Sequence, residues 1–223
     1  MKILVSGPVQ CGKSSYIKSF DANSLNIQAK GADDKYYTVG MDLGSVSINN
    51  YKTYLFGTPG LSRFSTIREI ISSGSDGIVF IFDASNPEKD EEARKILDSI
   101  YKILGNELPI IFLANKQDLE GARTPKDILK QNNLPSKIEI LPTSVKNGLN
   151  IKKSLKIIFG KIVMNYKDLL GILKSYEDNI KGLAEKLKKD KIEMKDFLNK
   201  LEIRKLIEID RLNKTFKVKN VLI

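Results

Sequence analysis

One stretch near the N-terminus constrains the fold most: Gly7 to Ser14, which reads GPVQCGKS. It matches the pattern G-x-x-x-x-G-K-[ST], a phosphate-binding loop that connects a strand to a helix. Residues 1–6 form a short apolar run typical of a buried strand, and residues 15–20 are compatible with a helix. We therefore predict a strand, a glycine loop and a helix at the start of the chain.

This loop predicts contacts to a nucleotide and to a metal. Glycines let successive backbone N–H groups turn toward phosphate oxygens. Lys13 is expected to reach the β- and γ-phosphates, and the Ser14 hydroxyl is expected to bind Mg²⁺. The residues assigned to phosphate binding are Gly7, Gln10, Cys11, Gly12, Lys13, Ser14 and Ser15.

Composition limits the class of protein. The chain has 223 residues, of which 41% are hydrophobic and 29% charged, as expected for a globular protein. One cysteine and no histidine exclude an internal disulfide and a Cys/His zinc set. No apolar run reaches the length of a membrane span, and neither a secretory signal nor a lipidation pattern is evident. We expect a cytoplasmic protein with no transmembrane segment.

The net charge of +10 is concentrated toward the C-terminus. Residues 161–223 carry 16 Lys/Arg and 10 Asp/Glu, whereas residues 1–160 carry 21 and 17. A basic segment raises the question of nucleic acid or acidic membranes as partners, although solvated lysine-rich faces are more common.

Strand and helix patterns alternate after the loop. Residues 21–35 look polar and irregular, and residues 45–48 and 51–56 flank Asn49-Asn50 as a β-hairpin. We predict further strands over residues 77–83, 108–114 and 137–141, and helices over 61–73, 87–104, after Pro125 and from about Asn150. This order predicts an α/β fold with a mostly parallel six-stranded sheet and helices on both faces.

A second motif, Asn115-Lys116-Gln117-Asp118, selects the base. A carboxylate at Asp118 can accept from both N1–H and the exocyclic amine of guanine, whereas adenine would leave it unpaired. Lys116 can lie along the base, and the backbone of Ser144, Val145 and Lys146 can donate to the guanine O6. With the phosphate loop, this motif predicts a GTP/GDP site.

Residues 1–162 resemble a small GTPase of the Ras/Arf-like class. By that resemblance, Thr38 binds Mg²⁺ and senses the γ-phosphate, and the Gly60 N–H contacts the γ-phosphate. Lys13, Thr38 and Gly60 are then the catalytic residues, and Ser14 and Thr38 the metal ligands. The resemblance also implies that protein regulators and effectors bind at residues 36–44 and 57–73.

Departures from the family pattern concern hydrolysis. Gly57 stands where the family has an aspartate that holds Mg²⁺, and Leu61 where it has a water-orienting glutamine. The segment Gly57-Thr58-Pro59-Gly60, preceded by residues 39–44, makes the chain more similar to a prokaryotic branch near the gliding-polarity GTPases than to eukaryotic Ras. Val9 replaces a common glycine and can crowd the attacking water. We expect slow turnover that depends on an activating partner. Asp42 or Asp83 could replace the missing acid.

Arg63 and Arg68 could supply a charge that the site lacks. We favour the alternative that both are exposed and solvated, or face a partner.

Residues 163–223 predict a second domain. Three helical segments precede a hairpin with strands at 206–210 and 215–219, a pattern that resembles a winged helix. Its third helix carries basic and amide side chains but also Asp196 and Glu202, which repel phosphate. We rate a protein partner slightly above DNA.

Two functions remain open at this point. In one, the protein is a GTP-binding switch whose state is read by partners or by the winged helix. In the other, it is a GTP/GDP-gated DNA-binding or protein-scaffolding module with vestigial hydrolysis.

Overall fold

The computed structural model describes residues 1–30, 36–49, 51–60 and 65–219. The chain divides into two compact units, Met1–Gly160 and Lys161–Ile223. The boundary lies inside one helix, α5 (Ile151–Lys174), two residues before the boundary expected from the sequence. The two units are described separately below.

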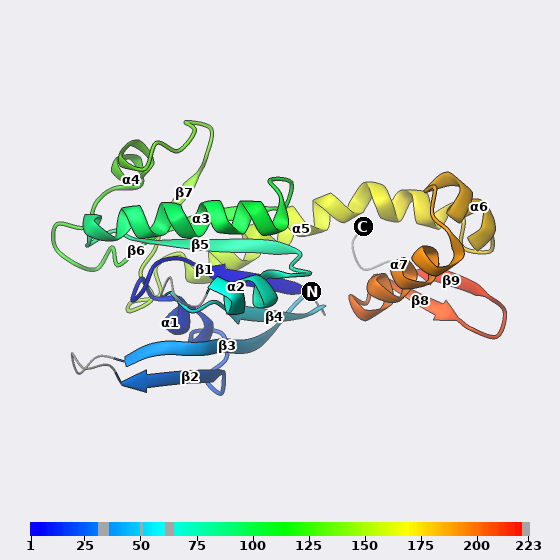
Figure 1. Ribbon diagram of the computed structural model, residues 1–223, viewed down its shortest axis with the longest axis horizontal. Coiled ribbons are helices and arrows are strands. Elements are labelled where there is room, and N and C mark those ends of the chain that lie inside the picture. Colours follow the sequence, from blue (N-terminus) through cyan, green and yellow to red (C-terminus); the bar gives the residue numbers. More distant parts are fainter. Residues whose placement is uncertain (31–35, 50, 61–64, 220–223) are drawn as a thin grey trace. The chain divides into compact units, whose positions relative to one another are not determined.

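The first unit is built on a seven-stranded sheet in the order β2-β3-β4-β1-β5-β6-β7, part of which can be followed from β5 to β2 in Figure 1. Strand β3 pairs with β2 and β4 in antiparallel fashion, and the other neighbours are parallel. The strands are β1 (Lys2–Ser6), β2 (Leu25–Lys30), β3 (Tyr36–Ile48), β4 (Tyr51–Gly57), β5 (Gly77–Asp83), β6 (Ile110–Asn115) and β7 (Ile140–Pro142). The expected α/β fold with a mostly parallel sheet is confirmed.

The predicted number of six strands was wrong, because residues 25–30 form strand β2 within a stretch interpreted as irregular. Leu25 and Ile27 are 50% and 47% exposed, so the described side chains of this edge strand form no buried apolar row. Backbone pairing with β3 defines the strand, and the hydrophobic pattern alone could not show it. The predicted hairpin at Asn49-Asn50 is confirmed, since Ile48 pairs with Tyr51.

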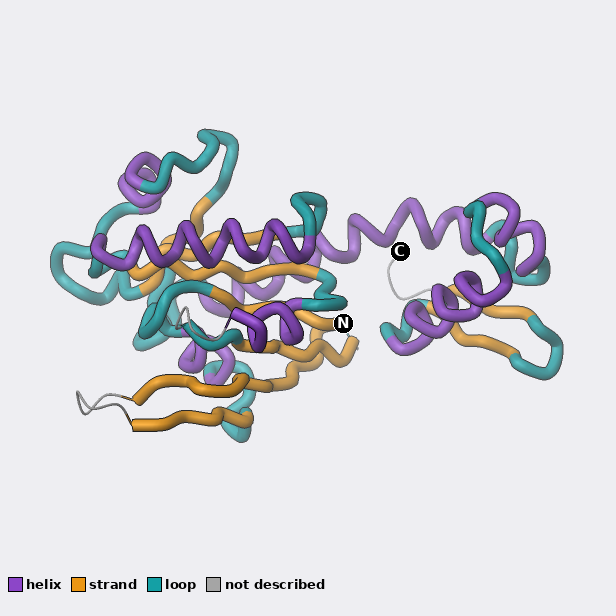
Figure 2. Tube along the Cα trace, in the orientation of Figure 1, coloured by secondary structure: helices purple, strands orange, loops and turns teal. Residues whose placement is uncertain are grey.

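Helices cover both faces of the sheet, as Figure 2 shows by colour. On one face, Phe80, Phe82 and Phe112 pack with the apolar stripe of α3 (Asp90–Leu104). On the other face, α1 (Lys13–Lys18) meets α5 through a hydrogen bond between the Tyr16 and Ser154 hydroxyls. The other helices that the structure describes in this unit are α2 (Ser65–Ser72), η2 (Pro87–Lys89) and α4 (Pro125–Gln131). Because β5 is buried on both faces, its sequence is apolar almost throughout.

The Tyr16–Ser154 contact makes a testable contribution to stability. Both hydroxyls are buried, the oxygens are 2.9 Å apart, and Ser154 donates onward to the Ile151 carbonyl. We expect Ser154→Ala to lower the free energy of unfolding by about 1–3 kcal/mol, because the Tyr16 hydroxyl then stays buried without a partner. Denaturant unfolding of S154A and of the Tyr16→Phe/Ser154→Ala double variant measures this. A double variant less stable than S154A would contradict the account.

The second unit combines the end of α5 with α6 (Ile180–Lys186), α7 (Lys191–Ile203) and the hairpin β8 (Ile207–Asp210) and β9 (Thr215–Val218). Asp190 caps α7 in a reciprocal capping box with Glu193, which explains where this helix begins. The apolar residues at the centre of the unit are Leu170, Leu173, Leu183, Met194, Leu198, Leu201, Leu206, Ile207 and Phe216. The three helical segments and the hairpin expected here are present, and each strand lies within one residue of its predicted bounds.

Within the described residues, none of the helices combines the length and the apolar character that a membrane-spanning helix needs.

Candidate functional site

The phosphate loop, residues 7–14, connects β1 to α1 and depends on its two glycines. Gly7 has φ +144°, and a side chain there would overlap the Ile81 carbonyl oxygen. Gly12 has φ +107°, and a side chain there would overlap the Asn115 amide. Both positions therefore require glycine. Between them, Gln10 has φ +60°, a left-handed conformation that most residues avoid.

Lys13 lies under the loop with its side chain buried. Its Nζ donates to the carbonyl oxygens of Gly7 (2.9 Å) and Pro8 (2.6 Å), which place the ammonium beside the loop. Cys11 Sγ is 3.9 Å from the same nitrogen. Burial raises the pKa of the Cys11 thiol, so the thiol stays neutral and leaves the charge of Lys13 available for an anion.

Asn115 joins the second motif to the phosphate loop. Its Nδ2 donates to the Cys11 carbonyl oxygen at 2.8 Å, and its Oδ1 accepts from the Val145 N–H at 3.2 Å. The buried Asn115 side chain thus connects three segments that are far apart in sequence. The motif did not indicate this role of connecting loops, and contact between Asn115 and the nucleotide stays a prediction.

Asp118 faces a cavity of about 420 Å³ beside the phosphate loop. The Ser144 hydroxyl donates to Asp118 Oδ1 at 2.5 Å, and this hydrogen bond is the main reason that the pKa of Asp118 is lowered. Asp118 is therefore an ionised acceptor at neutral pH. The cavity is lined by Gln10, Gly12, Ser15, Asn115, Lys116, Asp118, Leu119, Val145 and Lys146. Leu119 is the one lining residue that the sequence analysis missed.

Lys116 is held by an ion pair with Asp83 at the end of β5. Lys116 Nζ lies 2.6 Å from Asp83 Oδ2, and Asp83 Oδ1 accepts from the Ser85 N–H and hydroxyl. The Asp83 carboxylate is thus turned to Lys116 and Ser85. Asp83 is occupied in this way, so it does not stand in for the acid missing at Gly57.

Asp42 takes the space that Gly57 leaves open. The two residues are directly paired across β3 and β4, and a Cβ on Gly57 would lie 2.9 Å from both Cβ and Oδ2 of Asp42. The Ser14 hydroxyl donates to Asp42 Oδ2 at 2.7 Å. The carboxylate of Asp42 therefore reaches the phosphate loop from the neighbouring strand, next to the position where the family pattern has its aspartate.

The surroundings of Asp42 fit a bound cation. The residue is 1% exposed, and its Oδ1 has no hydrogen-bond partner within the part of the chain that the structure describes. Burial raises the pKa of this carboxyl, with the Ser14 hydrogen bond and the charge of Lys13 acting in the opposite direction. A buried carboxylate oxygen without a partner, beside a serine hydroxyl, is a suitable oxygen donor set for Mg²⁺.

The segment that contains Gly60 packs against the phosphate loop. A Cβ on Gly60 would lie 2.6 Å from the Cα of Val9 and 3.0 Å from Lys13 Nζ. The Val9 N–H donates to Glu92 Oε2 of α3 at 3.3 Å, a contact that the sequence gave no sign of. Gly60 therefore packs on the phosphate loop, and its contact with a γ-phosphate stays a prediction.

The prediction that Arg68 is exposed was wrong. It is 3% exposed, and its Nη2 donates to the Pro59 carbonyl oxygen at 3.3 Å. Because α2 packs against α3, the guanidinium points inward and supports the turn before Gly60. The residues predicted to sense the γ-phosphate and to affect hydrolysis are described only in part. The backbone of Thr38 pairs with Gln28, but the Thr38 side chain, Leu61 and Arg63 lie outside the described residues.

The fold and these contacts define an α/β protein with a phosphate-binding loop at the carboxyl ends of parallel strands. A sequence model of the Ras family matches residues 2–164. The chain therefore belongs to the Ras family, whose members are GTP-binding switches.

Individual relatives are distant. An uncharacterized protein of Methanocaldococcus jannaschii is 30% identical over 121 residues, covering 53% of this chain and 71% of that protein. The Ras-related protein Rab-7b of Bos taurus is 25% identical over 189 residues, with 81% and 90% covered. EF-hand calcium-binding domain-containing protein 4B of Homo sapiens is 27% identical over 158 residues, and the matched region is 69% of this chain but 21% of that protein.

Proposed function

We propose that this protein is a GTP-binding switch that hydrolyses GTP slowly and whose state is read by partner proteins or by its C-terminal unit. The main observation behind the proposal is that residues 115–118 are hydrogen-bonded to the phosphate loop. Asn115 bonds to the phosphate loop while Asp118 faces the adjoining cavity. One bound molecule can thus offer its phosphates to Lys13 and its base to Asp118.

Guanine suits the cavity better than adenine. The ionised Asp118 needs donors, and guanine supplies N1–H and the exocyclic amine on one edge. Lys116, positioned by Asp83, would lay its stem along the base, and the Val145 and Lys146 backbone would complete the pocket. The proposed phosphate contacts come from Gly7, Gln10, Cys11, Gly12, Lys13, Ser14 and Ser15.

Ser14 and Asp42 would hold Mg²⁺ in this site, with Thr38 as the further ligand that the family resemblance implies. Bound Mg²⁺ supplies positive charge that offsets the charge developing on the phosphates. Asp42 would act beside Ser14, directly or through water, in the role that Gly57 cannot fill. The protein supplies few ligands of its own, as is usual for magnesium bound to nucleotide phosphates.

Slow hydrolysis follows from the groups that would position the attacking water. The side chain of Leu61 has no hydrogen-bonding group, and Val9, within the phosphate loop, lies beside Gly60. Arg68 is engaged with Pro59, so it is not poised to replace an activating arginine. We propose that a protein partner bound at residues 36–44 and 57–73 supplies the missing group.

The C-terminal unit is the proposed reader of the switch. Its helices and terminal hairpin are compatible with a winged-helix-like domain at residues 163–223, which would bind protein or DNA. The alternative function is a GTP/GDP-gated DNA-binding or scaffolding module with vestigial hydrolysis. It is favoured by Gly57 and Leu61, which depart from the pattern for hydrolysis.

Nucleotide content and turnover of the purified full chain test the proposal. We expect bound GDP or GTP, a Mg²⁺ requirement, and a single-turnover rate on the order of 10⁻³ s⁻¹ or slower, because the water is poorly positioned. Lys13→Ala is the control that removes phosphate binding. Bound GTP with no hydrolysis over a day would favour the alternative function, and a preference for ATP would contradict both.

A further inference from the structure

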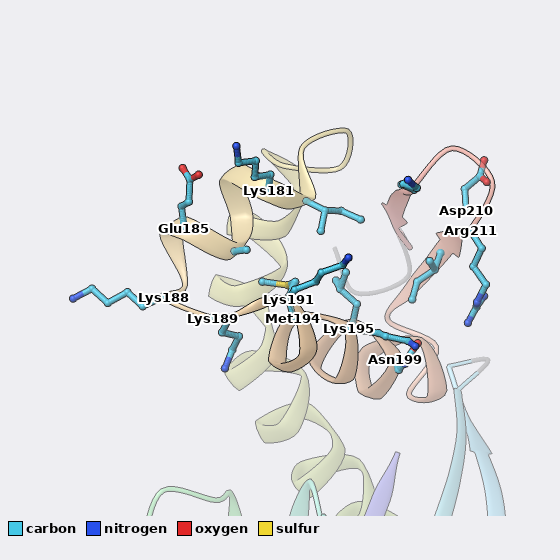
Figure 3. A pocket seen from close by; sticks show the side chains of 15 residues that line it. Lys181, Glu185, Lys188, Lys189, Lys191, Met194, Lys195, Asn199, Asp210 and Arg211 are labelled. Atoms are coloured by element: carbon cyan, nitrogen blue, oxygen red, sulfur yellow. The ribbon is translucent and has the colours of Figure 1, made fainter.

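The C-terminal unit contains a groove of about 940 Å³ between α6, α7 and the β8–β9 hairpin. Figure 3 shows Met194 near the middle of the view with the labelled lysines spread around it. The apolar residues of its lining are Ile180, Ala184, Met194, Leu198 and Ile209. These side chains come from three different elements and form a continuous apolar floor.

The rim of the groove is strongly basic. Seven lysines and arginines line it against two acids, Glu185 and Asp210. The Asp210 carboxylate is already hydrogen-bonded, since it accepts from the backbone N–H groups of Leu212 and Asn213. Arg211 forms an ion pair with Glu202. The groove therefore presents excess positive charge that the unit itself does not neutralise.

Five rim lysines have no carboxylate partner among the described residues of the chain. They are Lys181, Lys188, Lys191, Lys195 and Lys214. Long lysine side chains can keep their charge in water while their stems border an apolar surface. A partner that fits must bring apolar groups for the floor and carboxylates for the rim.

We propose that this groove docks an acidic amphipathic helix of a partner protein. The lining residues of α7 run from Lys191 to Asn199, about 12 Å along the helix at 1.5 Å per residue, which matches roughly two turns of a docked helix. Duplex DNA fits less well, because phosphates need donors along their path and the floor here is apolar. The exposed Glu193 and Asp196 on α7 would also repel a phosphate backbone.

This inference deepens the proposed function by naming the kind of partner that the C-terminal unit receives. The probe is a fluorescein-labelled helical peptide of about twenty residues, with leucines on one face and glutamates beside them. Its binding to the full chain is followed by fluorescence anisotropy, with a control peptide in which lysines replace the glutamates. We expect micromolar affinity for the acidic peptide and at least about tenfold weaker binding of the basic one.

Two charge-reversal variants locate the binding. Lys181→Glu/Lys195→Glu changes one groove lysine on α6 and one on α7, and we expect it to weaken peptide binding at least about tenfold. Lys186→Glu/Lys200→Glu changes one exposed lysine on each helix outside the groove, and binding should stay within about twofold. A benzophenone on the apolar face of the peptide should cross-link to Met194. Thermal unfolding of both variants checks that they fold.

Other occupants give distinguishable results. A peptide that fails to bind, or that both variants weaken equally, would overturn the proposal. So would groove-dependent binding of a 20-base-pair duplex, of anionic vesicles or of a second copy of the chain in place of the peptide. Repeating the titration with GDP and with a non-hydrolysable GTP analogue separates the docking proposal from the proposed switch function. Equal peptide binding in both nucleotide states would support the docking site but contradict the proposal that the C-terminal unit reads the switch.

Discussion

Asp42→Asn will raise the Mg²⁺ concentration needed to retain bound GDP by about 10–100-fold, the usual cost of losing a group that supports a metal. The reason is geometric. Asp42 Oδ2 receives the Ser14 hydroxyl at 2.7 Å, and its buried Oδ1 has no partner among the described residues. Asparagine keeps an acceptor for Ser14 but removes the charge that attracts the cation. Release of a fluorescent GDP analogue, measured across a Mg²⁺ titration, gives this value.

The same substitution should stabilise the protein when nucleotide and Mg²⁺ are absent. Burial raises the pKa of Asp42 above its ordinary value of 3.8, so the folded state binds a proton more readily than the unfolded state. Stability of the natural chain is therefore lost as the pH rises from that value through the raised pKa. We expect D42N to unfold a few degrees higher at pH 7, because the amide removes a buried charge whose desolvation opposes folding.

The advantage of D42N should shrink as the pH falls toward 4, where the natural carboxyl takes up its proton. Scanning calorimetry between pH 4 and 8 without nucleotide measures both trends. A variant that is less stable than the natural chain at every pH would mean that the charge of Asp42, through Ser14 and Lys13, stabilises the fold, and it would contradict the account.

Asp118→Asn will exchange the base that the site prefers. The carboxylate accepts two N–H groups from guanine, whereas the asparagine amide turns a donor toward one of them. We expect the affinity for GDP to fall by about 10²–10⁴-fold, the range seen when a site loses its hydrogen-bonding match to a substrate. Xanthosine diphosphate offers a carbonyl in place of the amine, so it should bind the variant better than GDP.

Competition of the two diphosphates against a fluorescent nucleotide measures this exchange. Asp127→Asn is a matched control, because its carboxylate caps α4 through Thr124 and lies outside the cavity lining. Equal loss of both diphosphates in D118N would show that Asp118 acts only through Ser144, to which it is hydrogen-bonded.

Local motifs in the sequence predicted most of the site. The spacing of Gly7, Gly12 and Lys13 fixes a loop by itself, because the positive φ values and the lysine belong to one short segment. The alternation of apolar strand patterns with helix patterns predicted the sheet in the same way. These features depend on residues close together in the chain.

Features that depend on pairing between distant segments could not be predicted. Asp42 lies beside the phosphate loop because β3 pairs with β4 in one register, which places it opposite Gly57. The described side chains of edge strand β2 form no buried row that would reveal it, and Arg68 is buried on a helix, α2, that packs on α3. The missing acid at Gly57 was visible in the sequence, which offered Asp42 and Asp83 as candidates, and the structure places Asp42 directly opposite Gly57.

Exchanging Asp42 and Gly57 tests the central claim. The claim is that this protein is a guanine-nucleotide switch whose Mg²⁺ site takes its carboxylate from β3. Asp42→Gly/Gly57→Asp moves the carboxylate to the neighbouring strand and removes the atoms that a side chain at Gly57 would meet on Asp42. Asp42→Gly alone is the control. In a Mg²⁺ titration of GDP release, we predict that the double exchange returns to within about tenfold of the natural chain, while the single variant does not. A double exchange no better than Asp42→Gly, or GDP release that is insensitive to Mg²⁺ in the natural chain, would contradict the claim.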